Sequence, residues 1–239
     1  MNKFGVVIVT YKRQNGTTFD KISRAIKSLN AQTYKDWKLF LIGDNYNDKQ
    51  EFQKIVDLLP PDKITAINLP FAAERESGKF SGHSLWCSAG ANASNVGMEQ
   101  SLKEGYNIHT HLDDDDIWRE FHLDTLNFGY NNFPEAVYVY TNAYYKDRHN
   151  SEKLFPQFYN PYIEYNNFPP KPESLIHSAA SWKLDKIPFR HRNVLEQGRD
   201  FPGDADMWER INKYCQEEDL KTLYIPITTV IKDSEFSDY

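Results

Sequence analysis

The first half of the chain alternates strand-length apolar runs with segments in which apolar residues recur at helical spacing. The opening run, Phe4 to Thr10, is rich in Val and Ile, as expected for a strand covered on both faces. Such an alternation predicts a parallel sheet joined by right-handed crossovers. The further predicted strands are Trp37 to Ile42, Ile64 to Leu69 and Tyr106 to Leu112, and the predicted helices are Phe19 to Leu29, Phe52 to Leu59 and Asn92 to Glu104.

Polar residues stand at the ends of three of these strands. Thr10 and Tyr11 end the first, Asp44 follows the second, and Asp113 to Asp116 follow the fourth. Open parallel sheets bind ligands beyond the carboxyl ends of their strands. We therefore expect these groups to converge on one edge of the sheet and to form a binding site.

The run Asp113-Asp114-Asp115-Asp116 is an uninterrupted block of carboxylates. Adjacent carboxylates repel each other, and a hard divalent cation with oxygen ligands is their natural partner, commonly bridging to phosphate. A solvated acidic turn is the competing interpretation. The convergence with Tyr11 and Asp44 favours the metal site.

The second half is less regular, and one domain with two functional halves, 1–116 and 117–239, is the simplest interpretation. The segment Tyr144 to Pro172 is rich in aromatic residues, Asn and Pro, and we expect a long excursion that includes a candidate acceptor wall over Tyr144 to Tyr165. The remaining predicted elements are helices over Phe121 to Asn131 and Asp204 to Gln216, and strands over Ala136 to Asn142, Ile176 to Trp182 and Leu223 to Ile231, the last as one strand or two.

Composition restricts the partners of the chain. A net charge of −6 argues against nucleic acid, which needs clustered Lys and Arg. Cys87 and Cys215 lack metal-ligand spacing and are expected to be reduced, partly buried thiols, as in a cytoplasmic protein. We find no signal peptide and no membrane-spanning segment, although peripheral contact with a membrane stays open. Nothing in the sequence sets the oligomeric state.

Five blocks of the chain stand out, at Val7 to Arg13, Gln32 to Asp44, Ala93 to Gly97, Leu112 to Asp116 and Gly203 to Arg210. In this order they resemble the sequence blocks of glycosyltransferase family 2. The first resembles the family's opening strand, and the second resembles its block that ends in an aspartate. The last three resemble its Ala-Arg-Asn-x-Gly, Leu-Asp-x-Asp-Asp and late Glu-Asp-x-x-Leu-Trp-x-Arg blocks.

The resemblance implies a GT-A fold, an α/β architecture with a Rossmann-like, mostly parallel central sheet, and transfer of a sugar from a nucleotide-diphospho sugar. By the same resemblance Asp115, with Asp113, would coordinate Mn²⁺ or Mg²⁺ at the diphosphate, and Asp204 would be the catalytic base of an inverting enzyme. Asp113 would also lie near the ribose, while Asp114 and Asp116 are the better candidates to brace the turn. The donor-binding residues would be Thr10, Tyr11, Arg13, Asp44, Asn95, Asp113 and Asp114.

Several residues have a structural interpretation beside the functional one, or depart from the family pattern. Asp204 could simply cap a helix, with Asp206 as the substitute base. Ser94 stands where the family has arginine, for which Arg75 or Lys79 could compensate, and Asp233 stands where many relatives have a histidine. Gly203 replaces an acidic residue. Trp208 is predicted to be core, Arg210 to pair with a carboxylate or a phosphate, His177 and His191 to be ordinary polar residues, and His109 and His111 to pack beside the strand.

The hypothesis is a metal-dependent, inverting hexosyl- or deoxyhexosyltransferase that uses a uridine-linked donor and a glycan or glycoconjugate acceptor. The first alternative is a catalytically silent nucleotide-sugar-binding protein. The second is a nucleotidyltransferase, which would favour a basic Gly-rich loop after the first strand. The segment Lys12 to Gly16 is only a faint version of such a loop.

Overall fold

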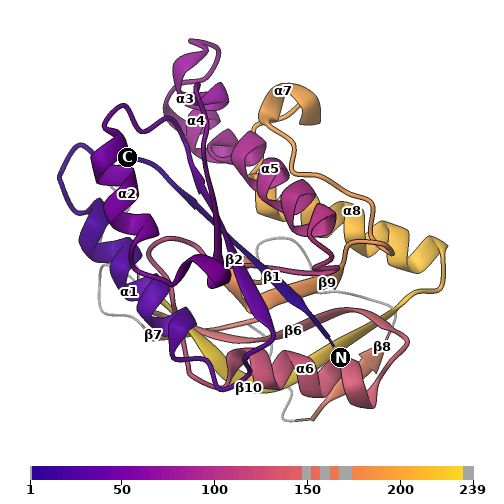
Figure 1. Cartoon of the computed structure of the whole chain (residues 1–239). Helices are drawn as coiled ribbons and strands as arrows, with labels where there is room; N and C mark the ends of the chain where they lie inside the picture. Colours follow the sequence, from indigo (N-terminus) through magenta and orange to yellow (C-terminus); the bar gives the residue numbers. More distant parts are fainter. Residues whose placement is uncertain (1, 147–151, 157–161, 167–173, 234–239) are drawn as a thin grey trace.

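A computed structural model describes residues 2–146, 152–156, 162–166 and 174–233. Its strands form one sheet in the order β3-β2-β1-β4-β9-β6-β10-β5, with β7 paired to β6 and β8 paired to β10. The sheet therefore runs through both halves of the chain (Figure 1). The strands are β1 Phe4–Thr10, β2 Trp37–Gly43, β3 Ile64–Asn68, β4 Ile108–His111, β5 Ile117–Trp118, β6 Ala136–Lys146, β7 Glu152–Phe155, β8 Glu164–Asn166, β9 Ala180–Lys183 and β10 Lys221–Asp233.

Helices and 3-10 turns connect these strands. The helices are α1 Thr18–Asn30, α2 Lys49–Val56, α3 Ala73–Glu76, α4 Gly82–Ser88, α5 Ala91–Lys103, α6 His122–Asn132, α7 Val194–Gln197 and α8 Gly203–Glu217, and the 3-10 turns are η1 Pro61–Lys63 and η2 His177–Ala179.

The parallel sheet predicted for the first half is confirmed. Strand β1 pairs in parallel with β2 and β4, and β2 pairs in parallel with β3. Beyond β4 the sheet becomes mixed, because β9 runs antiparallel to both β4 and β6, while β6 and β10 are parallel to each other. The final strand is a single long one with register shifts, which resolves the choice between one strand and two.

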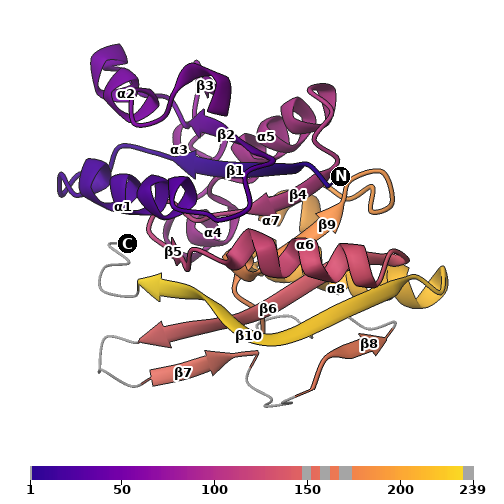
Figure 2. The same cartoon turned by 60° about the horizontal axis from the view of Figure 1, so that its bottom comes forward.

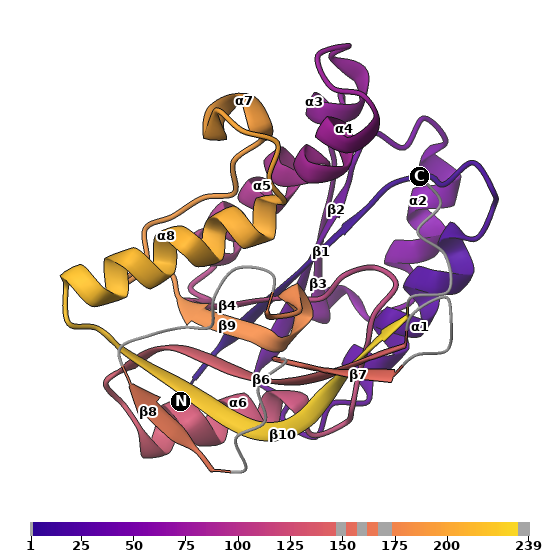
Figure 3. The same ribbon diagram turned by 180° about the vertical axis from the view of Figure 1, so that it is seen from behind.

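The helices cover both faces of the sheet. Figures 1 and 3 show α5 and α8 together on one face, and Figure 2 shows α1 and α6 on the other. Side chains of β1 alternate between these faces, so Val6 and Ile8 join the main core while Val7 meets α5. A Cβ on Gly97 of α5 would lie 2.6 Å from Val7 Cγ1, so this glycine permits the close approach of helix and strand.

Two segments are more structured than the sequence indicated. The polar segment Ala72 to Ser88 contains the short helices α3 and α4. The segment Tyr144 to Pro172 contributes the end of β6 together with β7 and β8, and the rest of that prediction lies outside the described residues. Within the described ranges, none of the helices has the length and apolar character needed to cross a bilayer.

His122 on α6 provides a test of this packing. Its ring stacks on Trp118 with centroids 4.2 Å apart, and Nδ1 lies 2.6 Å from the hydroxyl oxygen of Thr229. Burial lowers the pKa of His122 to about 3. Because the unfolded pKa is about 6.5, this neutral histidine stabilises the fold fully above that pH, and the stability is lost as the pH falls toward the folded pKa.

Below about pH 6.5 the unfolding free energy decreases as the pH falls, and we expect this decrease to be less steep in His122→Phe. The slope should change by up to about 1.4 kcal/mol per pH unit, which corresponds to one proton. Urea unfolding at a series of pH values measures this slope. His83→Phe, which removes an exposed histidine, is measured in parallel as the control. An unaltered slope in His122→Phe would contradict the assignment.

Candidate active site

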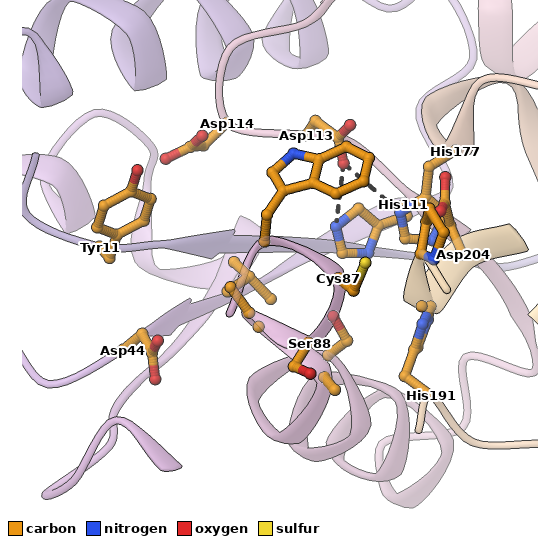
Figure 4. Close-up of a pocket in the computed structure, with 18 of the residues that line it drawn as sticks. Tyr11, Asp44, Cys87, Ser88, His111, Asp113, Asp114, His177, His191 and Asp204 are labelled. Carbon is orange, nitrogen blue, oxygen red and sulfur yellow. Dashed lines mark ion pairs between the residues drawn. The ribbon is translucent and has the colours of Figure 1, made fainter. Parts of the chain in front are cut away.

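One cavity of about 430 Å³ lies at the carboxyl ends of β1, β2 and β4, where the sequence predicted a binding site. It collects seven of the nine residues predicted to act in catalysis or in binding the donor or the metal. In Figure 4, Tyr11 and Asp44 lie at one end, Asp204 lies at the other, and Asp113 lies between them. The predicted site residues in its wall are Tyr11, Arg13, Asp44, Asp113, Asp114, Asp115 and Asp204.

Arg75 connects the two residues at the first end. Its guanidinium carbon lies 3.5 Å from the ring centroid of Tyr11, and its Nε lies 3.4 Å from Asp44 Oδ2. The Asp44 carboxylate is almost fully buried, and neither oxygen accepts a hydrogen bond from any residue that the structure describes. Burial raises the pKa of Asp44, and Arg75 opposes this effect. A buried acceptor without a hydrogen-bond partner is costly unless a ligand supplies a donor.

The acidic turn is held in place by two of its own members. Asp114 accepts hydrogen bonds from both terminal nitrogens of Arg13, at 2.9 and 2.5 Å. Asp116 accepts a 2.7 Å hydrogen bond from the hydroxyl of Ser178, and the same hydroxyl oxygen accepts the backbone N–H of Asp113. Asp114 and Asp116 therefore brace the turn, and Asp113 is left to face the cavity.

Two histidines surround Asp113. His111 Nε2 and His177 Nδ1 each lie 3.5 Å from Asp113 Oδ1, and the two rings stack with centroids 4.0 Å apart. One ligand atom from each of these three residues lies within 4.8 Å of the others, so together they could hold a metal ion. Burial lowers the pKa of His111 to about 3, which keeps its ring neutral and able to coordinate a cation.

Lys232, near the end of β10, approaches the same turn from the other side. Its Nζ lies 3.3 Å from Asp113 Oδ2 and 3.4 Å from Asp116 Oδ1. Burial raises the pKa of Asp113, but Lys232 and the two histidines outweigh it, so the pKa is lowered overall and the carboxylate stays ionised. Lys232 thus supplies a positive charge beside Asp113. The next residue, Asp233, has a side chain that lies outside the described structure.

Asp115 lines the cavity but does not belong to the histidine group. Its Oδ2 lies 3.5 Å from Arg13 Nη2 and 3.8 Å from Lys21 Nζ. Burial raises the pKa of Asp115. The structure thus gives Asp113 and Asp115 different neighbours within one cavity.

Asp204 stands in the first turn of α8 and is not its N-cap, which is Pro202. Its Oδ1 accepts the N–H of Ala205 at 2.8 Å, and burial raises the pKa of this carboxyl above its usual range. Asp206 cannot substitute for it, because it is fully buried and ion-paired with Arg192 at 2.6 Å and Arg210 at 2.8 Å. Arg210 therefore pairs with a carboxylate, which is one of the two partners expected for it.

Two predicted site residues lie behind the cavity wall. The hydroxyl of Thr10 is buried and lies 2.9 Å from the hydroxyl of Tyr46. Asn95 on α5 donates to the carbonyl of His191 and accepts its N–H, at 2.9 and 2.8 Å. These contacts place Thr10 and Asn95 where they support the walls.

The sequence interpretation missed the histidines. Three of them, His111, His177 and His191, line the cavity, whereas the sequence suggested that His177 and His191 are ordinary polar residues. The position of His111 could have been predicted, because it precedes Asp113 by two residues. In an extended chain, side chains two positions apart point to the same side. His109 and Trp208 are fully buried, as expected of residues that pack beside the strand or in the core.

Comparison with known proteins places the chain in a family. No protein-family profile matches it. It is 35% identical over 241 residues to an uncharacterized glycosyltransferase, R139, of Acanthamoeba polyphaga mimivirus, covering 98% of this chain and 95% of the relative.

Solved structures share the fold at 11% identity. S. aureus TarS 1-349 in complex with UDP-GlcNAc superposes with a TM-score of 0.65 over 99% of this chain, and the mannosyltransferase PcManGT of Pyrobaculum calidifontis, in complex with GDP-Man and Mn²⁺, does so with a TM-score of 0.56 over 99%. The chain spans only 61% and 58% of these two structures. The near full-length relative, the curled α/β sheet and the ordered sequence blocks together establish that the chain belongs to the glycosyltransferases, with a family 2-like fold.

Proposed function

We propose that this glycosyltransferase moves a sugar, with inversion, from a uridine diphosphate donor to a hydroxyl group of a glycan or glycoconjugate, and that it requires a divalent metal. The observation that carries the proposal is the order of groups along one cavity. Tyr11 and Asp44 form one end, the Asp113 group lies in the middle, and Asp204 forms the far end (Figure 4). A nucleoside, a diphosphate and an acceptor hydroxyl must be held in that same order.

The first end fits a nucleobase. The ring of Tyr11 offers a stacking face, and the Asp44 carboxylate, which lacks a hydrogen-bond donor among the described residues, can accept an N–H from the base edge. Uracil supplies one such N–H beside carbonyl oxygens, and Arg75 can donate to a carbonyl. TarS binds UDP and UDP-GlcNAc, which supports the uridine nucleotide.

The middle of the cavity fits a metal with mixed nitrogen and oxygen ligands. Asp113, His111 and His177 would hold it, and Asp115 on the same turn is a further carboxylate for it. Imidazole ligands suit Mn²⁺ better than Mg²⁺, which prefers oxygen alone, and PcManGT was solved with Mn²⁺. When bound, the metal supplies positive charge to the departing diphosphate. Lys232 adds a fixed positive charge beside Asp113.

The far end fits a general base. As the acceptor oxygen attacks the anomeric carbon, it must lose its proton, and Asp204 can accept it. The raised pKa of Asp204 makes it a stronger base than an exposed aspartate would be. A direct displacement assisted by one carboxylate inverts the anomeric configuration.

Metal dependence gives the first test. We expect nucleoside diphosphate release from a panel of UDP- and GDP-linked sugars, with a carbohydrate acceptor, to require Mn²⁺. Chelation should reduce release by two or more powers of ten, since a Lewis-acidic metal contributes several kcal/mol to the barrier. Adding Mn²⁺ back should restore the activity, and Mg²⁺ should restore less of it. Proton NMR of the product anomeric centre reports inversion.

The same assay separates the alternatives. Donor binding without turnover across the panel would favour the silent nucleotide-sugar-binding protein. Release of pyrophosphate instead of nucleoside diphosphate would favour the nucleotidyltransferase. Turnover that survives complete chelation would overturn the metal requirement while leaving the transferase intact.

A further inference from the structure

Trp86 on α4 is an aromatic residue of the cavity wall to which the proposed chemistry gives no role. It lines the cavity with 43% of its surface exposed. The four other tryptophans, Trp37, Trp118, Trp182 and Trp208, are at most 2% exposed. An indole that could be buried but instead forms the wall of a polar cavity is available to a ligand.

The helix that carries Trp86 is fixed at both ends. A capping box between Ser81 and Ser84 begins α4, and Gly90 with a positive φ of 83° follows its end. His83, one turn earlier, stacks on the indole with ring centroids 5.4 Å apart and an interplanar angle of 24°. The stacking on His83 restrains a ring that lines the cavity, which keeps the entropic cost of binding a ligand on it low.

The end of α4 also meets the wall that carries Asp204. A Cβ on Gly203 would lie 3.2 Å from the carbonyl oxygen of Cys87, and the hydroxyl oxygen of Ser88 accepts the N–H of Val194 at 3.0 Å. Burial raises the pKa of the Cys87 thiol, and the Asp204 carboxylate adds to the effect, as expected of near neighbours. Trp86 thus immediately precedes Cys87, which contacts Gly203, the residue next to Asp204.

We propose that Trp86 is the stacking platform for the pyranose ring of a carbohydrate acceptor, which it positions with a hydroxyl toward Asp204. The C–H face of a pyranose packs on an aromatic ring, and an indole offers the largest such face. The nucleoside has its own aromatic residue in Tyr11, at the Asp44 end of the cavity. The half-exposed position of Trp86 suits a substrate that enters from solvent. This inference rests on the proposed transferase function.

The isolated exposure of Trp86 makes binding measurable without turnover. Acrylamide quenches exposed tryptophans, so the quenchable fluorescence of this protein reports Trp86. With UDP and Mn²⁺ present, we expect at least one of the methyl pyranosides of glucose, galactose, mannose and N-acetylglucosamine to protect it from quenching. Protection by UDP and Mn²⁺ alone would assign Trp86 to the nucleoside, and protection by UDP-GlcNAc without a pyranoside would assign it to the donor sugar. Either result, or no protection by any pyranoside, overturns the proposal.

Variants add a kinetic readout. Trp86→Ala should raise the acceptor KM about tenfold, and Trp86→Phe should retain most of the affinity. Phe71→Ala, an equally exposed aromatic residue that does not line the cavity, is the matched control. An acceptor KM that is the same in Trp86→Ala and the parent overturns the proposal. If the parent shows no turnover at all, the transferase function fails, while the quenching result still decides whether Trp86 binds a sugar.

Discussion

Asp204→Asn is expected to lower turnover by a factor of about 10² to 10⁴, the range that a positioned general base contributes. The amide keeps the size of the carboxylate and its oxygen can still accept the N–H of Ala205, so the first turn of α8 should remain intact. What the variant loses is the ability to take the proton of the acceptor hydroxyl. Steady-state release of nucleoside diphosphate, together with the affinity for UDP, measures the two effects separately.

The control for this variant is Asp200→Asn, which changes an exposed aspartate four residues earlier. It should leave both turnover and nucleotide affinity close to the parent values. If Asp204→Asn retained more than about a tenth of the parent activity, the general-base assignment would fail. If nucleotide affinity fell together with turnover, Asp204 would belong to the donor site instead.

Asp113→Asn is expected to weaken Mn²⁺ binding at least about 100-fold, because loss of even an outer-shell partner of a metal costs 10- to 100-fold. Turnover should fall by a similar factor or more. Among the residues that the structure describes, Asp113 is the one carboxylate placed against both His111 and His177, and its other oxygen lies beside Lys232, so none of these residues can take over both contacts. Electron paramagnetic resonance of free Mn²⁺ measures the affinity directly.

Asp115→Asn is the informative comparison, because Asp115 shares the turn but faces Arg13 and Lys21. We expect its Mn²⁺ affinity to fall less than that of Asp113→Asn. The reverse order would favour the assignment of the metal to Asp115, which the family resemblance implied, over the histidine group. Thermal unfolding of both variants without metal shows whether either change has disturbed the turn.

The elements that the sequence predicted well are those whose signal is local. The apolar run of β1 matches its prediction residue for residue, and α5 and α8 begin and end within one residue of theirs. The pairing of β9 between β4 and β6 was not predictable, because antiparallel insertion depends on contacts between segments some 70 and some 40 residues apart. The short helices α3 and α4 were missed because each is too brief to show a helical period.

The candidate site followed the same division. Tyr11, Asp44 and Asp113 come directly after strands, so topology alone brings them to one edge. His177 and Lys232 reach Asp113 from η2 and β10, more than 60 and 110 positions away in the chain, and no spacing rule connects them to it. The carboxylates of the cavity could therefore be identified from the sequence. The imidazole and ammonium groups that shift the pKa values of these carboxylates are brought near them only by the tertiary fold.

The position of Arg75 has a consequence for how the free protein meets its donor. The guanidinium covers one face of Tyr11 and pairs with Asp44, the two groups that we assign to the nucleobase. A base that stacks on that face must first displace this side chain. The measured affinity is then the intrinsic affinity multiplied by the fraction of molecules in which Arg75 has swung away.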